Sequence, residues 1–259
     1  MILDYKGIPI FYSDDGLGDT VVLLHGFLEN TSMWNKIIPH ISRGNRVISV
    51  DLLGHGNTGC LGYIHSMEDM AEAVQAVLAH LDIKRAIFIG HSMGGYVALA
   101  FADLFPEKVS GICLANSTSQ ADGDERKINR DRAIKAVKQN HKAFVSMAVT
   151  NLFAENNREN LKIEIETVKN EALKTPLQGI IAALEGMKIR PSRKNILKTG
   201  NFKKLMIIGT HDTVIQRDSL ISEAKSTHTK FIEFEGGHMS YVENEVFFLQ
   251  EIMRFIDLI

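Results

Sequence analysis

Short apolar runs alternate with longer amphipathic stretches along most of the chain. The runs are rich in β-branched and aromatic residues and occupy residues 21–24, 46–50, 86–89, 109–114, 205–208 and 230–234. Nearly continuous apolar runs of this kind are typical of strands that are covered on both faces of a parallel sheet. Apolar positions with helical spacing predict helices over residues 67–81, 92–105, 219–225 and 244–259. This alternation predicts an α/β fold with a mostly parallel sheet, and residues 1–12 add an antiparallel hairpin.

The alternation breaks off between residues 117 and 192. This segment has no convincing strand, and its pattern predicts helices at about 124–139, 141–153, 158–173 and 176–187. One alternative is that some of these helices are ordinary crossover connections, but a normal crossover takes only about 12–20 residues. We therefore expect residues 1–116 and 193–259 to form the core, and residues 117–192 to be inserted as a helical cap over one end of the sheet.

Composition places the chain among globular proteins of ordinary make-up. Its 259 residues are 45% hydrophobic and 23% charged, and the net charge is −2, which excludes the strongly basic signature of a nucleic-acid binder. Cys60 and Cys113 form neither a disulfide framework nor a zinc-binding pattern. No signal peptide and no membrane-spanning apolar run of about 18 residues is visible. We expect a cytoplasmic protein without a membrane span.

The most informative motif is Gly90-His91-Ser92-Met93-Gly94-Gly95, which joins the predicted strand at 86–89 to a predicted helix. A sharp strand-to-helix turn strains the backbone of its central residue and leaves no room for side chains two positions away. Gly90 and Gly94 supply that room. The helix N-terminus also favours negative charge next to the serine. The alternative is a glycine-rich turn with a helix-capping serine; we predict instead that Ser92 is a nucleophile.

A serine hydroxyl needs a base, and the base needs an acid that orients it. His238 lies in Glu235-Gly-Gly-His-Met-Ser240, between the last predicted strand and the final helix, and is the candidate base. Asp212 follows the predicted strand at 205–208 and is the candidate acid, with Asp218 as its competitor. The resulting order Ser92, Asp212, His238 is that of a serine–acid–histidine triad on an α/β sheet.

Two backbone N–H groups are needed to stabilise the oxyanion that forms during attack by the serine. Met93 directly follows the nucleophile, and Phe27 lies in His25-Gly-Phe27 after the predicted strand at 21–24, so we expect these two amides to form the oxyanion hole. His25 is interpreted as a hydrogen-bonded support of its loop, and His91 as packing beside the strand-to-helix turn rather than as a second base. Asp51 and His55 are interpreted as holding their own loop together. No His, Asp or Glu pattern has metal-ligand spacing, so neither a metal nor a cofactor is expected.

Four motifs together resemble the α/β-hydrolase superfamily, and in particular its small capped bacterial members. They are His25-Gly-Phe27 followed by Trp34, Asp51-Leu-Leu-Gly-His-Gly56, Gly90-His-Ser-Met-Gly-Gly95 and Gly237-His238. The resemblance implies an eight-stranded, mostly parallel sheet with a cap inserted after strand six. It also implies an acyl-enzyme mechanism, with Ser92 as nucleophile, His238 as base, Asp212 as acid, and the amides of Phe27 and Met93 as oxyanion hole.

Within the superfamily, the residues favour a carboxylesterase, with enol-lactonases as similar proteins. Ser92 argues against the haloalkane dehalogenases and epoxide hydrolases, which place Asp at the nucleophile position of the strand-to-helix turn. Phe27-Leu-Glu-Asn30 replaces the Gly-Pro-Gly-like run of the C–C hydrolases, and Tyr96 replaces the arginine of the menaquinone-pathway synthase. We therefore expect hydrolysis of a small-molecule carboxylic ester. A lactone, thioester or C–C bond is the alternative, as is a ligand-sensing signalling protein, which would differ by releasing hardly any product.

The predicted cap is rich in apolar side chains, and part of one face must turn toward the serine. These side chains are Phe144, Met147, Val149, Leu152, Phe153, Ile180, Ile181, Leu184 and Met187. We expect them to favour substrates with an uncharged, apolar acyl group of modest length. If the substrate instead carries a carboxylate, Arg126, Arg130 or Arg190 is the expected partner of that anion.

Overall fold

The computed structural model describes residues 1–259, and its centre is an eight-stranded sheet in the order β1-β2-β4-β3-β5-β6-β7-β8. The strands are β1 (Ile2–Tyr5), β2 (Ile8–Asp15), β3 (Asp19–Leu24), β4 (Asn45–Val50), β5 (Ala86–His91), β6 (Val109–Ala115), β7 (Lys203–Gly209) and β8 (Lys230–Phe234). β1 and β2 form the predicted antiparallel hairpin, and β2 is also antiparallel to β4. All other neighbours are parallel. The predicted α/β class and the eight strands are confirmed.

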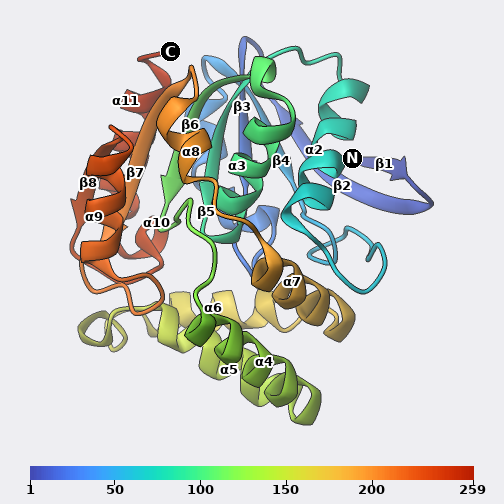
Figure 1. Cartoon of the computed structure of the whole chain (residues 1–259), viewed down its shortest axis with the longest axis vertical. Helices are drawn as coiled ribbons and strands as arrows, with labels where there is room; N and C mark the ends of the chain where they lie inside the picture. Colours follow the sequence, from blue (N-terminus) through green and yellow to red (C-terminus); the bar gives the residue numbers. More distant parts are fainter.

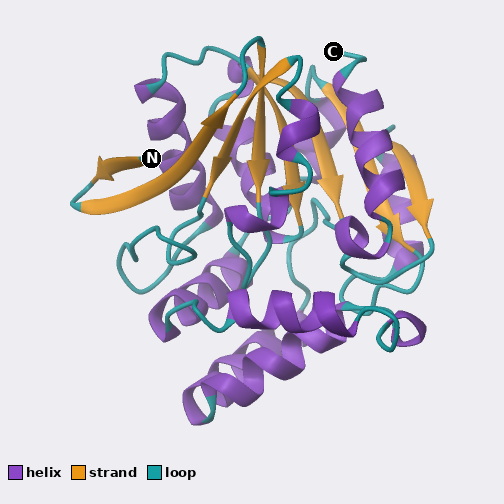
Figure 2. Cartoon of the chain, turned by 180° about the vertical axis from the view of Figure 1, so that it is seen from behind, coloured by secondary structure: helices purple, strands orange, loops and turns teal.

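Helices cover both faces of this sheet. Those of the core are α1 (Ile38–Ile41), α2 (Met67–His80), α3 (Met93–Leu104), α8 (Lys194–Thr199), α9 (Arg217–Ser226), α10 (Ser240–Glu243) and α11 (Glu245–Ile256), with 3-10 turns η1 (Thr31–Trp34) and η2 (Pro106–Lys108). α2 and α3 lie in front of the sheet in Figure 1, whereas α11 lies in front of it in Figure 2, which shows the opposite side. No helix combines the length and the apolar character needed to cross a membrane.

The segment between β6 and β7 folds into a separate layer of helices. It contains α4 (Asp124–Gln139), α5 (His141–Leu152), η3 (Glu155–Asn157), α6 (Lys162–Ala172) and α7 (Leu177–Ile189). α4 packs against α5 and α7, and α5 packs against α6. The arrowheads of the central strands point toward this layer (Figure 2). Because parallel strands end together at one edge, the loops that follow them lie between the sheet and these helices.

Two helix boundaries differ from the sequence-based expectation by three or more residues. The helix predicted over 158–173 begins only at Lys162, because Asn157 donates a hydrogen bond to Glu243 on α10 (2.7 Å) and keeps the preceding chain in a 3-10 turn. The helix predicted over 244–259 ends at Ile256, after which the chain is exposed. The short helices α1, α8 and α10 were not predicted, because four to six residues are too few to show an apolar repeat.

Candidate active site

Ser92 occupies the sharp turn between β5 and α3. Its φ of +48° and ψ of −113° are rarely adopted by a residue with a side chain, and such a conformation persists only when its surroundings enforce it. Its N–H donates to the carbonyl of Ala115 (2.9 Å), and its carbonyl accepts from the hydroxyl of Ser117 (2.7 Å). A Cβ on Gly94 would collide with the backbone of Leu24. The turn is therefore fixed to both neighbouring strands, as the motif predicted.

The three residues predicted from the chain order lie in hydrogen-bond contact. The Ser92 Oγ is 2.8 Å from Nε2 of His238, and Nδ1 of His238 is 2.7 Å from Oδ2 of Asp212. His238 follows β8 and is 2% exposed, and its backbone N–H donates to the carbonyl of Leu152 at the end of α5 (2.7 Å). With a proton on Nδ1, the imidazole donates to the carboxylate and offers Nε2 as acceptor for the serine hydroxyl. This arrangement can activate a serine for nucleophilic attack.

Asp212 is held by more donors than the histidine alone. Its Oδ1 accepts from the N–H groups of Val214 (2.7 Å) and Ile215 (3.0 Å). Burial raises the pKa of Asp212, but His238 and these two amides outweigh it and leave the pKa below its ordinary value. The carboxylate therefore stays charged in its buried position.

The competing acid, Asp218, lies elsewhere. Its side chain is 92% exposed at the start of α9 and pairs with Arg217. It makes no contact with His238, so its placement favours Asp212 as the orienting acid.

The predicted oxyanion amides lie on either side of the candidate site, one at the N-terminus of α3 and one in the loop after β3. Met93 is the first residue of α3, and Phe27 lies in the turn after β3, where Leu28 has a φ of +66°. No hydrogen bond within the protein occupies the N–H of Phe27. Phe27 and Ser92 line the same cavity, so this amide is free to bind a ligand oxygen.

The histidines interpreted as loop supports do support their loops. His25 donates from Nδ1 to the carbonyl of Gly26 (2.7 Å) and accepts at Nε2 from the N–H of Leu52 (2.9 Å), which fixes one neutral tautomer. Burial lowers the pKa of His25 below its ordinary value and that of His55 to about 3. Asp51 accepts from the N–H groups of Thr31 (2.7 Å) and Asn57 (2.8 Å). These contacts confirm the structural roles expected for the loops.

Two buried residues that the sequence analysis missed surround His91. Glu29 accepts at Oε2 from the N–H of Gly26 (2.6 Å) and from Nδ1 of His91 (2.7 Å), and at Oε1 from the hydroxyl of Tyr241 (3.0 Å). Burial raises the pKa of Glu29, but the neighbouring His91 outweighs it and leaves the pKa lowered. Conversely, burial lowers the pKa of His91, and Glu29 outweighs this effect and leaves it raised. The sequence does show a carboxylate three residues after Gly26, in a loop predicted to lie close to the nucleophile. This position could have indicated a role for Glu29 near the site.

Ser92 and His238 open onto a small cavity of about 90 Å³. Its apolar wall comes from both the core and the helical layer, and consists of Phe27, Leu28, Tyr96, Ala148, Leu152, Met187 and Val214. Of the apolar residues predicted in the cap, Leu152 and Met187 reach this cavity. Met147 is 58% exposed instead. The space beside the serine is therefore narrow and mainly apolar.

Two positively charged side chains from α4, those of Arg126 and Arg130, also line the cavity. Both guanidinium groups, together with that of Arg190, pair with the fully buried carboxylate of Asp122. Three positive charges thus surround one negative charge, and two of the three arginines face the cavity. Arg190 stacks on the ring of Tyr96, with 3.9 Å between the guanidinium carbon and the ring centroid, and does not line the cavity.

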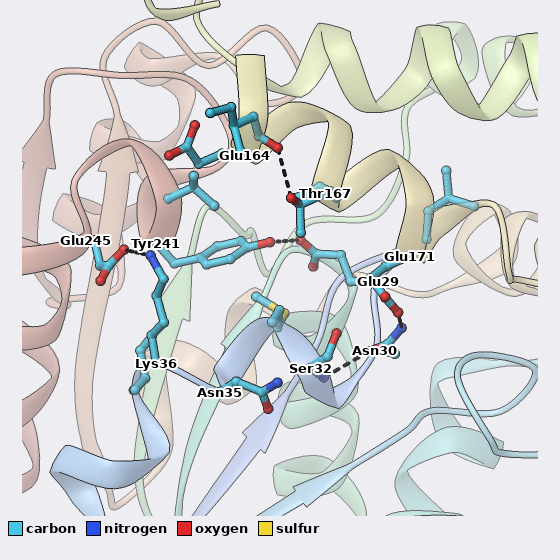
Figure 3. A pocket seen from close by; sticks show the side chains of 16 residues that line it. Glu29, Asn30, Ser32, Asn35, Lys36, Glu164, Thr167, Glu171, Tyr241 and Glu245 are labelled. Atoms are coloured by element: carbon cyan, nitrogen blue, oxygen red, sulfur yellow. Dashed lines mark hydrogen bonds and ion pairs between the residues drawn. The ribbon is translucent and has the colours of Figure 1, made fainter. Parts of the chain in front are cut away.

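A second, larger cavity of about 380 Å³ lies between η1, α6 and α10 (Figure 3). Leu28 and Glu29 line both cavities. The hydroxyl of Tyr241 points to Glu29 across one wall (Figure 3). Across the whole protein, no three His, Cys, Asp or Glu side chains are grouped so that they could hold a metal ion.

Comparison with known proteins agrees with this architecture. A family model described as alpha/beta hydrolase fold matches residues 19–245. The chain is 26% identical over 248 residues to a putative non-heme haloperoxidase of Mycobacterium phage D29, over 90% of this chain and 85% of that protein. A thermophilic esterase from Thermogutta terrifontis superposes with a TM-score of 0.91 and 27% identity, over 99% of this chain and 96% of that one. An enol-lactonase from Burkholderia xenovorans LB400 has the same TM-score at 21% identity, over 99% and 100% of the two chains, and shows the shared fold alone. These similarities support hydrolase activity, and the chain belongs to the α/β hydrolase fold family.

Proposed function

We propose that this protein is a serine hydrolase that cleaves a small-molecule carboxylic ester through an acyl-enzyme formed on Ser92. The observation that carries the proposal is the continuous hydrogen-bonded chain from Ser92 through His238 to Asp212, at the edge of a cavity. The likeness to an esterase at 27% identity over nearly the whole chain supports ester hydrolysis.

The reaction follows from the placement of these groups. Ser92 Oγ attacks the ester carbonyl carbon while its proton passes to Nε2 of His238, and the amides of Phe27 and Met93 stabilise the negative carbonyl oxygen. The bond to the alcohol oxygen then breaks, and the alcohol leaves with the proton from His238. A water molecule attacks the acyl group on Ser92 by the same route and releases the acid.

We infer that residues 117–192 form a cap that encloses the substrate. Leu152 and Met187 from this segment line the cavity beside Ser92, and the backbone of Leu152 accepts the N–H of His238. Because the wall is largely apolar and the volume small, we expect an apolar acyl group of modest length.

A second candidate is an ester or lactone that carries a carboxylate. This candidate is favoured by an excess of positive charge. Arg126 and Arg130 face the cavity and share a single carboxylate partner with Arg190. Guanidinium groups suit carboxylates well because their donors match both oxygens. The Thermogutta terrifontis esterase was solved with malate bound, and malate is a dicarboxylate.

Replacement of the nucleophile tests the proposed function. Ser92→Ala removes the attacking oxygen and is expected to lower kcat on p-nitrophenyl butyrate by several orders of magnitude, since loss of a triad member typically has that effect. A fluorophosphonate probe should label the wild type once and leave this variant unlabelled. Ser222→Ala, at an exposed position on α9, is the matched control. More than a few per cent of residual activity in Ser92→Ala would exclude this nucleophile.

A pair of substrates separates the two candidates. If the substrate is apolar, p-nitrophenyl butyrate should have a higher kcat/KM than the mono-p-nitrophenyl ester of succinic acid. If it carries a carboxylate, the order should reverse, and Arg126→Gln should raise KM for the succinate ester about tenfold or more, as expected for a lost charged hydrogen bond. Arg132→Gln, on the exposed side of α4, is the control for a change in overall charge.

A further inference from the structure

His91 is placed between the Glu29 carboxyl group, whose lowered pKa keeps it ionised, and a backbone carbonyl, and both of these groups then only accept hydrogen bonds. Its Nδ1 is 2.7 Å from the carboxylate of Glu29, and its Nε2 is 2.9 Å from the backbone carbonyl of His238. A neutral imidazole has one N–H and one bare nitrogen, so it could satisfy only one of these contacts as a donor. With a proton on each nitrogen, both contacts are hydrogen bonds. This geometry fits an imidazolium paired with a carboxylate.

We propose that Glu29 and His91 form a buried carboxylate–imidazolium pair that positions the oxyanion loop relative to the catalytic base. Each member of the pair contacts one of the two segments that are to be aligned. Glu29 binds the loop that carries Phe27, and His91 binds the backbone of the residue that takes the serine proton. Glu29 and His91 are thus positioning residues, and the inference rests on the serine mechanism proposed above.

Glu29 holds the turn of the oxyanion loop through two hydrogen bonds. The N–H of Glu29 donates to the carbonyl of Gly26 (3.2 Å), and the Glu29 carboxylate accepts from the N–H of Gly26 in return (2.6 Å). Phe27 lies inside this closed turn, so its amide direction depends on both contacts. A Cβ on Gly26 would meet the Glu29 carboxylate and Nδ1 of His91. The turn and the pair therefore fit together only with glycine at this position.

His91 holds the candidate base, His238, through the backbone of that residue. The carbonyl of His238 accepts from His91, while its N–H donates to Leu152, so both peptide groups of the base are anchored. The rings of His91 and His238 lie 5.3 Å apart between centroids. A shift in His91 would therefore move the base with respect to Ser92, and misplacement of reacting groups by even about 1 Å can cost roughly 100-fold in rate.

The surroundings of His91 are compatible with a positive charge. The charged and titratable groups that face the pair are Glu29, Asp212, His25, His238 and Tyr241. Two of these are carboxylates whose pKa values are lowered, and burial lowers the pKa of His25, which keeps that ring neutral. Tyr241 adds a third donor to Glu29 and closes the wall of the larger cavity (Figure 3). The one imidazolium is thus balanced by adjacent negative charge.

The pair predicts a specific pH profile. Because Glu29 raises the pKa of His91, wild-type kcat should fall on the alkaline side, where His91 loses a proton and one of its two hydrogen bonds. Glu29→Gln removes the charge that holds this proton, so burial should leave His91 neutral at neutral and alkaline pH. We expect kcat about tenfold lower at neutral pH, little change in KM, and no alkaline fall. A merely structural contribution from Glu29 would lower stability without changing the shape of the profile.

A control at another buried carboxylate separates these effects. Glu223 is 1% exposed and accepts from the hydroxyl and N–H of Ser119 (both 2.7 Å), away from the cavity beside Ser92. Glu223→Gln should reduce the melting temperature but keep the wild-type pH profile. If it changes kcat and the profile as Glu29→Gln does, the proposed positioning role is wrong.

The protonation state can be measured directly on the wild type. Two-bond ¹H–¹⁵N spectra at pH 7 should show His91 with protons on both ring nitrogens, the signal being assigned by its loss in His91→Gln. A single ring proton on His91, or wild-type kcat and pH profile in Glu29→Gln, would overturn the proposal. Neither measurement depends on Ser92→Ala: if that variant stays active, the serine mechanism fails, whereas an inactive Ser92→Ala beside a neutral His91 refutes the positioning pair alone.

Discussion

Asn116 donates its side-chain amide to Oδ2 of Asp212 (3.2 Å) and to the carbonyl of Gly237 (3.2 Å), and so joins the candidate acid to the loop of the candidate base. It stands directly after β6, next to β7 in the sheet, and its φ is +47°. Asparagine tolerates this left-handed conformation better than most residues. One side chain at the end of β6 thus contacts both the segment after β7 and the segment after β8.

Removal of the Asn116 amide should weaken the candidate triad without removing any of its members. Asn116→Gly suits the positive φ, whereas Asn116→Ala adds backbone strain of about 1–2 kcal/mol. Both variants lose a hydrogen bond to a charged group, typically worth about 1.5–3 kcal/mol, so we expect kcat to fall roughly tenfold in both. The free energy of unfolding measured in urea should be lower in the alanine variant than in the glycine variant, because only the alanine variant carries the additional strain. Full activity in the glycine variant would show that the amide does not matter.

The identity of the acid can be tested by a pair of isosteric changes. Asp212→Asn keeps the shape of the site but cannot hold the imidazole of His238 in the required tautomer, and in serine proteases such a change lowers kcat by about 10⁴-fold. Asp218→Asn alters an exposed side chain beside Arg217 and should leave kcat within twofold. The measurement is kcat on p-nitrophenyl butyrate, with circular dichroism as a check of folding. A larger loss in Asp218→Asn would reverse the assignment.

The parts of the structure that depend on local patterns could be predicted from the sequence. Residues 86–89 and 205–208 are continuous apolar runs that lie within β5 and β7, and the glycines around Ser92 mark a turn that no other residue type allows. Chain order then placed Asp212 and His238, because residues after neighbouring parallel strands meet at one edge of the sheet.

The contacts that were missed join residues that are distant in the sequence. Glu29 reaches His91 across 62 positions and Tyr241 across 212, and nothing in a loop carboxylate indicates whether it will be buried. Asn116 reaches Asp212 across 96 positions, and an asparagine directly after a strand gives no local sign of such a contact. Similarly, the late start of α6 depends on a contact between Asn157 and α10, which no local pattern contains.

Stability should decline on both sides of an optimum at about pH 6.5. Folding lowers the pKa values of His25 and His55, so these buried neutral rings reduce stability as the pH falls below their unfolded pKa of about 6.5. The pKa values of Glu29 and Asp212 are lowered by folding, so their contributions are complete above their unfolded pKa of about 4 and are lost as the pH falls through the folded values. The pKa of His91 is raised, so its contribution is complete below about pH 6.5 and is lost as the pH rises through the folded value. Urea unfolding between pH 3 and 10 measures the resulting curve.

The same titration in Glu29→Gln assigns the alkaline side of that curve. Without the carboxylate, folding no longer raises the pKa of His91, so the alkaline decline should become shallower while the acid decline due to Asp212 remains. An equally steep alkaline decline in the variant would show that another group is responsible.

Chelators should leave the activity unchanged. The proposed reaction takes its nucleophile from Ser92, its base from His238 and its electrophilic stabilisation from the amides of Phe27 and Met93, so no step calls on a metal ion. We expect the same initial rates before and after prolonged dialysis against EDTA. Activity that is lost on dialysis and restored by a divalent ion would contradict this mechanism.

The acyl-chain preference should follow from the small apolar cavity. Each buried methylene is worth up to about 0.8 kcal/mol, close to fourfold in kcat/KM when it is fully desolvated in the transition state. We therefore expect p-nitrophenyl butyrate or hexanoate to be cleaved faster than the acetate, with a fall at longer chains, because a cavity of about 90 Å³ leaves them no room. Met187→Ala enlarges the cavity wall and should move the optimum to longer chains. Met147→Ala, on the exposed face of α5, should not move it. A series that peaks at acetate in all three proteins would mean that the acyl group does not lie against this wall.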